Sequence, residues 1–365
     1  MNKRVLISGG GTGGHIFPAL AIAKEIERRD ADTHFLFVGA SGRMEMEKMP
    51  VAGYEIKGLW ITGFKRNFSI SNIIFPLKLL FSLIKSFFIL LRFNPQVVIG
   101  TGGFASGPIL WVASVMGIPT LIQEQNSYPG ITNRLLSSRV RTICVAYEGL
   151  DRFFPKDKIR LTGNPIRVEI EIETYQREIE IRSLGLNPDK PIVLVVGGSL
   201  GAKKINEIVL ENINWFKNNG VQLIWQTGKL YYARCNESKN ILGSWGLIKP
   251  FIKKMGLSLS IADIVVSRAG AIALSEICCL GKTAILVPSP NVAEDHQTKN
   301  ALALTENLAA LMVEEKNIEK ELFPTLQKLI DNEELKNQIS INSRKMTHIR
   351  AVENIVDQIE YLVND

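Results

Sequence analysis

The stretch VLISGGGTGGHIFPAL, Val5 to Leu20, decides the fold prediction because it joins a strand-like run to a helix-like run through a cluster of glycines. Gly9, Gly11 and Gly14 satisfy the pattern GxGxxG. Glycine lets the backbone turn tightly and approach a ligand closely, and a helix N-terminus offers unpaired N–H groups to an anion. The next expected strand ends FVGASGR, without the acid that holds a ribose in dinucleotide-binding proteins. We therefore expect an anion-binding loop and disfavour a nicotinamide dehydrogenase.

Length and charge set the broad class. A chain of 365 residues predicts two domains, and 46% hydrophobic with 22% charged residues is typical of soluble globular proteins. The formal net charge of +7 indicates an anionic partner, which charge alone cannot identify as a membrane surface, a nucleic acid or a phosphorylated small molecule. Four cysteines without a CxxC pair fit a reducing compartment, and the N-terminal apolar run is too short for a signal-peptide core. We expect a cytosolic protein.

Strand-like runs alternate with helical segments and then restart, which predicts an α/β fold of two doubly wound, Rossmann-like domains facing a cleft. The expected strands are 5–8, 33–39, 97–100, 120–124 and 142–146, followed by 192–198, 221–228, 262–270 and 283–289. The turn signals in RLTGNPIRVEI, 160–170, mark the boundary. The expected domains are an N-terminal acceptor- and membrane-binding domain, 1–162, and a C-terminal nucleotide-sugar domain, 163–341. A helix within 342–365 is expected to dock on either half.

Three further segments repeat the strand, glycine turn and helix arrangement. GTGGFASGP, 100–108, lies in the first half, and GGSLGAKK, 197–204, and SRAGAIALSE, 267–276, lie in the second. The helix expected to begin at Ala271 could take a diphosphate, and Glu276 could bind both hydroxyls of a ribose. Taken alone, Glu276 is more simply a solvated helix carboxylate.

The segment 68–93 is apolar but carries charges at a regular spacing. Lys78, Lys85 and Arg92 recur every seven residues and share one face of a helix starting near Pro76, while Phe81 and Phe88 lie on the others. An apolar helix with a basic stripe is typical of a membrane interface, with the cations toward anionic headgroups. The alternative is a buried amphipathic helix whose lysines face solvent.

Taken together, the motifs resemble the MurG family of bacterial N-acetylglucosaminyltransferases over nearly the whole chain. The resemblance rests on GGGTGGHIFPALAIA, TGGFASGP, QEQN (123–126), GNPIR (163–167), VVGGSLGA (195–202), SRAGAIALSE and EDHQTKNA (294–301). It implies a glycosyltransferase B fold, UDP-N-acetylglucosamine as donor and undecaprenyl-pyrophosphoryl-N-acetylmuramyl-pentapeptide as acceptor. It also implies peripheral attachment to the cytoplasmic face of an anionic membrane, no nucleic-acid partner, no cofactor and no metal.

The resemblance also assigns binding residues. The donor would contact Thr12, Gly13, Gly14, Asn126, Arg167, Ser199, Ile252, Ala271, Ile272, Ala273, Leu274, Ser275, Glu276 and Gln297. We expect the acceptor diphosphate at the two glycine loops of the first half, with Gly11, Gly102, Gly103 and Ser106. Three residues depart from the family pattern, namely Leu200, Phe104 and His296.

The implied reaction is an inverting displacement, in which the acceptor C4 hydroxyl attacks the anomeric carbon. The hydroxyl needs a base, and His15 is the first candidate because an unperturbed imidazole titrates near pH ~6.5. Glu124 is the second candidate. Two other functions stay open at this point: a UDP-N-acetylglucosamine 2-epimerase, and a non-catalytic membrane module that binds nucleotide-sugars.

Overall fold

The computed structural model describes residues 3–63, 73–166, 176–348 and 350–364, and it consists of two compact units. Unit 1 comprises Met1–Ile166 and His348–Asp365, and unit 2 comprises Arg167–Thr347. Each unit is built on a sheet whose strand pairs are all parallel. The predicted fold class, two doubly wound Rossmann-like domains, is therefore confirmed.

In the described part of unit 1, seven strands lie in the order β3-β2-β1-β4-β5-β6-β7. They are β1 (Arg4–Gly9), β2 (His34–Ala40), β3 (Ile56–Leu59), β4 (Val97–Gly102), β5 (Thr120–Glu124), β6 (Thr142–Val145) and β7 (Ile159–Leu161). The helices are α1 (Gly13–Arg29), α2 (Glu45–Val51), α4 (Phe75–Phe93), α5 (Ser106–Val115), α6 (Ile131–Leu136) and α18 (Ala351–Asn364), with short 3-10 turns η1 (Leu150–Arg152) and η2 (Lys156–Lys158).

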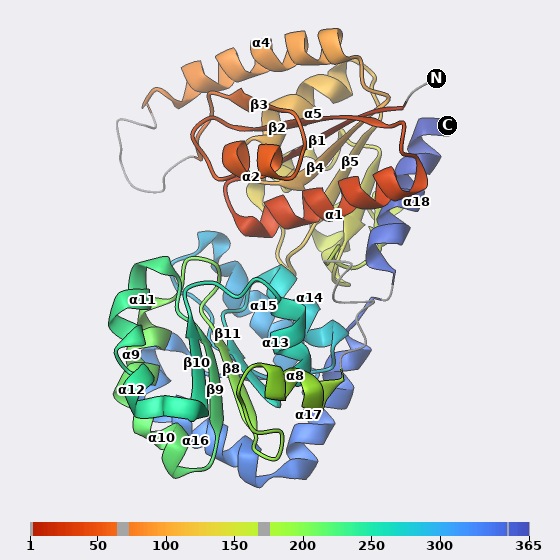
Figure 1. The fold of residues 1–365 in the computed structure, drawn as a ribbon. Coiled ribbons are helices and arrows are strands. Elements are labelled where there is room, and N and C mark those ends of the chain that lie inside the picture. Colours follow the sequence, from red (N-terminus) through yellow and green to blue (C-terminus); the bar gives the residue numbers. More distant parts are fainter. Residues whose placement is uncertain (1–2, 64–72, 167–175, 349, 365) are drawn as a thin grey trace. The chain divides into compact units, whose positions relative to one another are not determined.

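Alternation along the strands gives the unit 1 sheet two apolar faces. Leu6 and Val98 point into a core closed by α4 and α5, whereas Val5 and Ile99 point into a core closed by α1 and α18. Figure 1 shows α4 and α5 on one side of this sheet and α1 with the blue C-terminal helix α18 on the other. The last helix of the chain therefore completes the first unit.

In the described part of unit 2, six strands lie in the order β10-β9-β8-β11-β12-β13. They are β8 (Ile192–Val196), β9 (Gln222–Gln226), β10 (Gly246–Lys249), β11 (Ile264–Ser267), β12 (Thr283–Leu286) and β13 (Leu311–Met312). The helices are α8 (Arg177–Ser183), α9 (Lys203–Glu211), α10 (Ile213–Asn218), α11 (Lys229–Asn236), α12 (Lys239–Leu242), α13 (Met255–Ile261), α14 (Ala271–Cys279), α15 (His296–Thr305), α16 (Ile318–Asp331) and α17 (Glu333–Lys345), with 3-10 turns η3 (Gly243–Trp245), η4 (Ala293–Asp295) and η5 (Glu315–Asn317).

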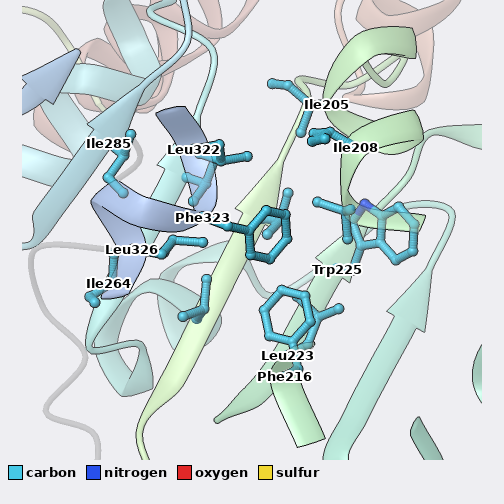
Figure 2. Close-up of a cluster of buried hydrophobic side chains, with 14 of the residues drawn as sticks. Ile205, Ile208, Phe216, Leu223, Trp225, Ile264, Ile285, Leu322, Phe323 and Leu326 are labelled. Carbon is cyan, nitrogen blue, oxygen red and sulfur yellow. The ribbon is translucent and has the colours of Figure 1, made fainter. Parts of the chain in front are cut away.

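The core of unit 2 is centred on aromatic side chains. Trp225 of β9 is fully buried, and its indole Nε1 donates to Asn206 Oδ1 at 3.0 Å. Phe216 of α10 and Phe323 of α16 pack edge to face with ring centroids 5.8 Å apart. Figure 2 shows these rings among aliphatic side chains from both α9 and α16. This core fixes the strands whose carboxyl ends carry the second set of loops.

Candidate active site

The two glycine loops of unit 1 are interlocked at the carboxyl ends of β1 and β4. The Gly10 N–H donates to the Gly102 carbonyl at 3.4 Å. A Cβ at Gly103, where φ is +87°, would collide with the Gly10 carbonyl, and a Cβ at Gly9 would collide with the Thr101 hydroxyl. Glycine is therefore required here by contact between the two loops as well as by the turn geometry.

A buried carboxylate that the motif analysis missed supports the first loop. Glu45, at the start of α2, is fully buried and accepts the Gly11 N–H and the Ala40 N–H, each at 2.9 Å. A Cβ at Gly10 or Gly39 would collide with the Glu45 side chain. The Gly11 N–H thus already donates to the Glu45 carboxylate. It is therefore not available to donate to the predicted diphosphate in this structure.

His15 lies in the first turn of α1 with its ring held from the neighbouring strands. The ring Nδ1 is 2.9 Å from the Thr101 carbonyl oxygen and 3.1 Å from Gln125 Oε1. Because a carbonyl oxygen can only accept, we assign the proton to Nδ1, which makes Nε2 the basic nitrogen of the neutral imidazole. Thr101 also donates its hydroxyl to the His15 carbonyl at 2.8 Å. The imidazole is therefore held in one tautomer, in which Nε2 can accept a proton.

Gln125 is a second residue that the motif analysis missed. It is 1% exposed, and its Nε2 donates to the Thr101 carbonyl at 2.7 Å and also to Gln123 Oε1. Gln123 in turn donates to Asn164 Oδ1 at 3.1 Å. This buried amide chain joins His15 to the GNPIR segment, and a sequence pattern alone gives no sign of it.

Glu124, the other candidate base, is 1% exposed at the end of β5. Its Oε1 accepts the backbone and side-chain N–H of Asn126, both at 3.0 Å. Its Oε2 accepts the Gly130 N–H at 3.1 Å and Asn133 Nδ2 at 2.8 Å. With four donors on its two oxygens, this carboxylate organises the loop that carries Asn126.

The remaining predicted residues of unit 1 occupy the same end of the sheet. Thr12 and Gly14 are exposed and Gly13 is partly buried, so the start of α1 is open to a ligand. Ser106 is different, because its hydroxyl is fully buried and lies 2.9 Å from both the Ser8 and Gly102 carbonyls. This geometry gives Ser106 a role in holding the loops together, and it does not support the predicted contact with a diphosphate.

In unit 2, a buried glutamine connects two of the predicted donor-binding loops. Gln226, 2% exposed at the end of β9, donates from Nε2 to the Gly198 carbonyl at 3.0 Å and accepts the Ile252 N–H at 2.8 Å. Ser199 follows Gly198 and is exposed, and so is Leu200. The GGSLG loop and the segment at Ile252, both predicted to contact the donor, are therefore held at a fixed spacing.

The helix predicted to bind diphosphate and ribose begins as expected at Ala271, directly after the turn at Gly270. Glu276 is 4% exposed, so the expectation of a solvated carboxylate is wrong. Along the same turns, Ala271, Ile272 and Leu274 are buried and Ala273 and Ser275 are partly buried. Because Leu274 is 0% exposed, its side chain packs in the core and is not available to a ligand in this structure.

An ion pair holds the turn before α14. Arg268 pairs with Glu315 and donates to the Val287 and Pro288 carbonyls, both at 3.1 Å. The nearby Gln297 is partly buried and accepts the Ser289 N–H at 2.9 Å. The predicted residue Arg167 lies outside the described residues.

Helix α4 exposes its apolar side, contrary to the alternative of a buried amphipathic helix. The exposed side chains are Leu77, Leu80, Phe81, Ile84, Phe87, Phe88 and Leu91, which we call the α4 apolar face. The inner side carries the buried Ser82, Ser86 and Leu90. The spacing of these three residues matches the helical period and places them against unit 1.

The basic residues of α4 lie along the border of this face. Lys85 Nζ donates to the Gly58 carbonyl at 2.6 Å, and Lys78 Nζ is 3.4 Å from Thr62 Oγ1 and 5.6 Å from the Trp60 ring centroid. Both ammonium groups thus turn back to the β3 segment, although we expected them to point to headgroups. Arg92, the penultimate residue of α4, is exposed.

None of the helices in the described ranges is long and apolar enough to cross a membrane. Among the same residues, no three His, Cys, Asp or Glu side chains are grouped so that they could hold a metal ion.

Two parallel sheets that carry glycine loops at their carboxyl ends define a Rossmann-like enzyme of the glycosyltransferase B type. Residues 5–145 match the glycosyltransferase family 28 N-terminal domain, and residues 192–358 match the glycosyltransferase family 28 C-terminal domain. The chain belongs to glycosyltransferase family 28.

Relatives and solved structures agree with this family. The chain is 50% identical, over 99% of its own length and 98% of the relative's, to the UDP-N-acetylglucosamine--N-acetylmuramyl-(pentapeptide) pyrophosphoryl-undecaprenol N-acetylglucosamine transferase of Christiangramia forsetii. The crystal structure of MurG from Acinetobacter baumannii is similar with a TM-score of 0.78 at 28% identity, covering 98% of this chain and 99% of that one. The protein is therefore an enzyme of the glycosyltransferase class.

The epimerase alternative is not favoured. A UDP-N-acetylglucosamine 2-epimerase from Neisseria meningitidis is similar with a TM-score of 0.67, over 98% of this chain and 100% of that chain, but at 16% identity. A likeness at that identity shows the shared fold alone.

Proposed function

We propose that this protein transfers N-acetylglucosamine from UDP-N-acetylglucosamine to the C4 hydroxyl of a lipid-linked N-acetylmuramyl-pentapeptide, with inversion at the anomeric carbon. The observation that carries the proposal is the fixed imidazole of His15 beside two interlocked glycine loops, in a chain 50% identical to a transferase named for this reaction. The Thr101 carbonyl and Gln125 Oε1 accept from Nδ1 and so leave Nε2 as the nitrogen that can take a proton from a hydroxyl.

Unit 2 holds the donor in this proposal. The exposed Ser199 and the start of α14 at Ala271 face the diphosphate, and Glu276 and Ile252 take the ribose and the uracil. The leaving diphosphate gains negative charge as the glycosidic bond breaks, and the N-terminus of α14 stabilises that charge. Gln297 would bind the sugar hydroxyls, after giving up its bond to the Ser289 N–H or sharing it.

Unit 1 activates the acceptor. His15 Nε2 accepts the proton of the C4 hydroxyl, while the Thr101 carbonyl stabilises the imidazolium that forms, through its bond to Nδ1. Glu124 is a positioning residue here, because its oxygens already accept four N–H groups of the loop that carries Asn126. We assign the acceptor diphosphate to the glycine loops after β1 and β4, whose predicted contacts include Gly102 and Gly103, and we assign Thr12, Gly13 and Gly14 at the exposed start of α1 to the donor.

The α4 apolar face attaches the protein to the membrane in which the acceptor resides. Exposed phenylalanines such as Phe81 and Phe88 insert among the lipid chains, and the exposed Arg92 attracts anionic headgroups. The charges of Lys78 and Lys85, whose ammonium groups turn back to the β3 segment, add to the positive potential at the border. We place this attachment at the cytoplasmic face, where UDP-N-acetylglucosamine is expected.

The test is transfer of labelled N-acetylglucosamine to a lipid-linked N-acetylmuramyl-pentapeptide by the purified full chain. Appearance of label in the lipid fraction with release of UDP is the expected result. Donor binding without transfer would instead favour a non-catalytic nucleotide-sugar module. Formation of an epimer from UDP-N-acetylglucosamine alone would favour the epimerase.

A further inference from the structure

Within the α4 apolar face, α4 and the residue after β3 border an open apolar hollow of about 490 Å³. It is lined by Trp60, Phe81, Ile84, Phe88 and the side chain of Lys85. The ring centroids of Trp60 and Phe81 are 6.0 Å apart, so the two rings form adjoining walls. The volume lies within the range of pockets that hold small ligands, about 300–1,000 Å³.

The ammonium groups at this hollow belong to its rim. Lys85 Nζ donates to the Gly58 carbonyl, and Lys78 Nζ lies above the Trp60 ring. The methylene groups of the two lysines therefore border the apolar surface, and their ammonium groups lie at the β3 end of the hollow. A hollow of this kind matches an amphiphile with a single hydrocarbon chain and an anionic group close to it.

The hollow lies next to the glycine loops through a short run of contacts. Trp60 follows β3, so it lies at the same end of the parallel sheet as the loops after β1 and β4. Three residues further on, the backbone at Gly63 packs on the Phe104 ring, at 3.4 Å from a Cβ built there, and the same ring packs on Gly11 at 3.5 Å. The Arg43 guanidinium lies 5.9 Å from the Phe104 centroid. If a lipid diphosphate binds at the glycine loops, the hydrocarbon chain attached to it can follow this run of contacts to the hollow.

We propose that the hollow between Trp60 and α4 binds the first isoprene units of the acceptor's polyprenyl chain, as a subsite distinct from general insertion of the α4 apolar face into lipid. This inference rests on the proposed function, since the acceptor is taken to be a polyprenyl diphosphate. The chain leaves the glycine loops past Phe104, enters between Trp60 and Phe88, and continues into the bilayer.

The test uses soluble acceptor analogues whose chains increase from one isoprene unit, assayed as monomers without membrane or detergent. The acceptor KM of the unaltered protein should fall at least about tenfold as the chain lengthens, because each buried CH2 contributes to binding, and should level off once the hollow is filled. Ile84→Ser and Phe88→Ser should flatten this dependence and leave the donor KM unchanged.

Matched controls separate the hollow from the rest of the face. Phe87 and Leu91 are 43% and 54% exposed, close to the 47% of Ile84 and 62% of Phe88, but they do not line the hollow. Phe87→Ser and Leu91→Ser should weaken liposome binding as much as the hollow variants do, yet retain the chain-length dependence. An equal change in acceptor KM from both pairs would overturn the proposal, and so would a chain-independent KM in the unaltered protein. Absence of transfer to every analogue would instead refute the proposed function.

Discussion

At the scale of single residues, the candidate site depends on buried polar groups that hold His15 and its loop. The glycines and His15 could be predicted from sequence because a loop between a strand and a helix constrains residue types in a fixed local order. Glu45, Gln125 and Gln226 could not be found that way, because each acts on a segment distant in the chain. Only the folded structure brings a glutamate of α2 under Gly11.

Replacing His15 tests the proposed base. We expect His15→Ala to lower kcat by about 100-fold or more while the KM for UDP-N-acetylglucosamine changes little, because most of the predicted donor contacts lie in unit 2 and His15 is not one of them. Glu124→Gln is the comparison. An amide cannot accept from all four donors, so that variant should lose roughly 1–3 kcal/mol of unfolding free energy and retain more turnover than His15→Ala. Near-normal turnover of His15→Ala would contradict the assignment.

Lys282 gives a stability prediction that depends on pH. Its ammonium donates to the Ser260 and Ala262 carbonyls at 2.6 and 3.0 Å, and burial lowers its pKa to about 8 from the ordinary lysine value of 10.5. The folded state therefore binds fewer protons than the unfolded state between these values, and stability must rise with pH there.

The measurement compares the unaltered protein with Lys282→Met by denaturant unfolding at several pH values. The unfolding free energy of the unaltered protein, relative to the variant, should increase from about pH 8 to about pH 10 and stay constant at lower pH. A difference that does not change with pH would show that Lys282 keeps its ordinary pKa in the folded protein.

At the scale of elements, the long amphipathic helices and the buried strands were predictable and the short edge strands were not. The helix expected near Pro76 runs from Phe75 to Phe93, and the helix expected at GGSLGAKK begins at Lys203. The strands β3, β7, β10 and β13 lie at the sheet margins, and most of their side chains are only partly buried or exposed, so no continuous apolar run marks them in the sequence. The helical stretch expected over 342–363 is in fact the end of α17 and all of α18.

The link between α2 and the first glycine loop can be tested at Glu45. In Glu45→Gln, one of the two N–H groups of Gly11 and Ala40 faces an amide NH2, so the loop loses a buried hydrogen bond. We expect a marked fall in kcat and a loss of roughly 1–3 kcal/mol of unfolding free energy.

Glu25→Gln provides the control for general destabilisation. Glu25 is 5% exposed, and hydrogen bonds from Arg28, with a further bond from Arg29, lower the pKa of its carboxyl group. It lies at the opposite end of α1, so its loss should reduce stability comparably with little effect on kcat. Equal effects of the two variants on kcat would argue against a positioning role for Glu45.

The docking of α18 depends on Arg29 of α1. Its guanidinium donates to Asp357 at 2.6 Å, Glu360 at 3.0 Å and the Glu353 carbonyl at 3.1 Å. Arg29→Met should lower the unfolding free energy by roughly 1–3 kcal/mol and increase hydrogen exchange in 351–364. Arg28→Met is the control, because Arg28 is 66% exposed and bonds to Glu25, not to α18. Similar exchange in the two variants would contradict the role of Arg29.

At the scale of the whole molecule, the fold class could be predicted from the alternation of strands and helices. The side of α4 that is exposed could not. Periodicity separates the apolar side of a helix from its polar side without telling which one meets the protein. Helix α4 is apolar on both sides, since Leu79, Leu83 and Leu90 pack against the core of unit 1 while Phe81 and Phe88 face outward, where an ordinary surface helix is polar. The outward side is therefore a contiguous apolar surface, which marks an interaction site.

Membrane attachment can be measured by sedimentation with liposomes. The protein should pellet with anionic vesicles at low salt and less at high salt, because the border cations are screened. Phe81→Ser with Phe88→Ser should reduce binding at both salt concentrations, whereas Arg92→Gln should reduce only the salt-sensitive part. Equal recovery in the supernatant with and without vesicles would refute attachment through α4.

The position of α18 has a consequence for synthesis on the ribosome. Ile355, Val356 and Ile359 of α18 pack in the same core as Ile22 and Phe37, although more than 300 residues separate them in the chain. Residues 167–347 are thus an insertion within the first unit, and they emerge before that unit can be completed. Unit 2 can reach its native state while one sheet face of unit 1 still lacks its cover. Nascent chains at that stage would expose an apolar surface that chaperones bind.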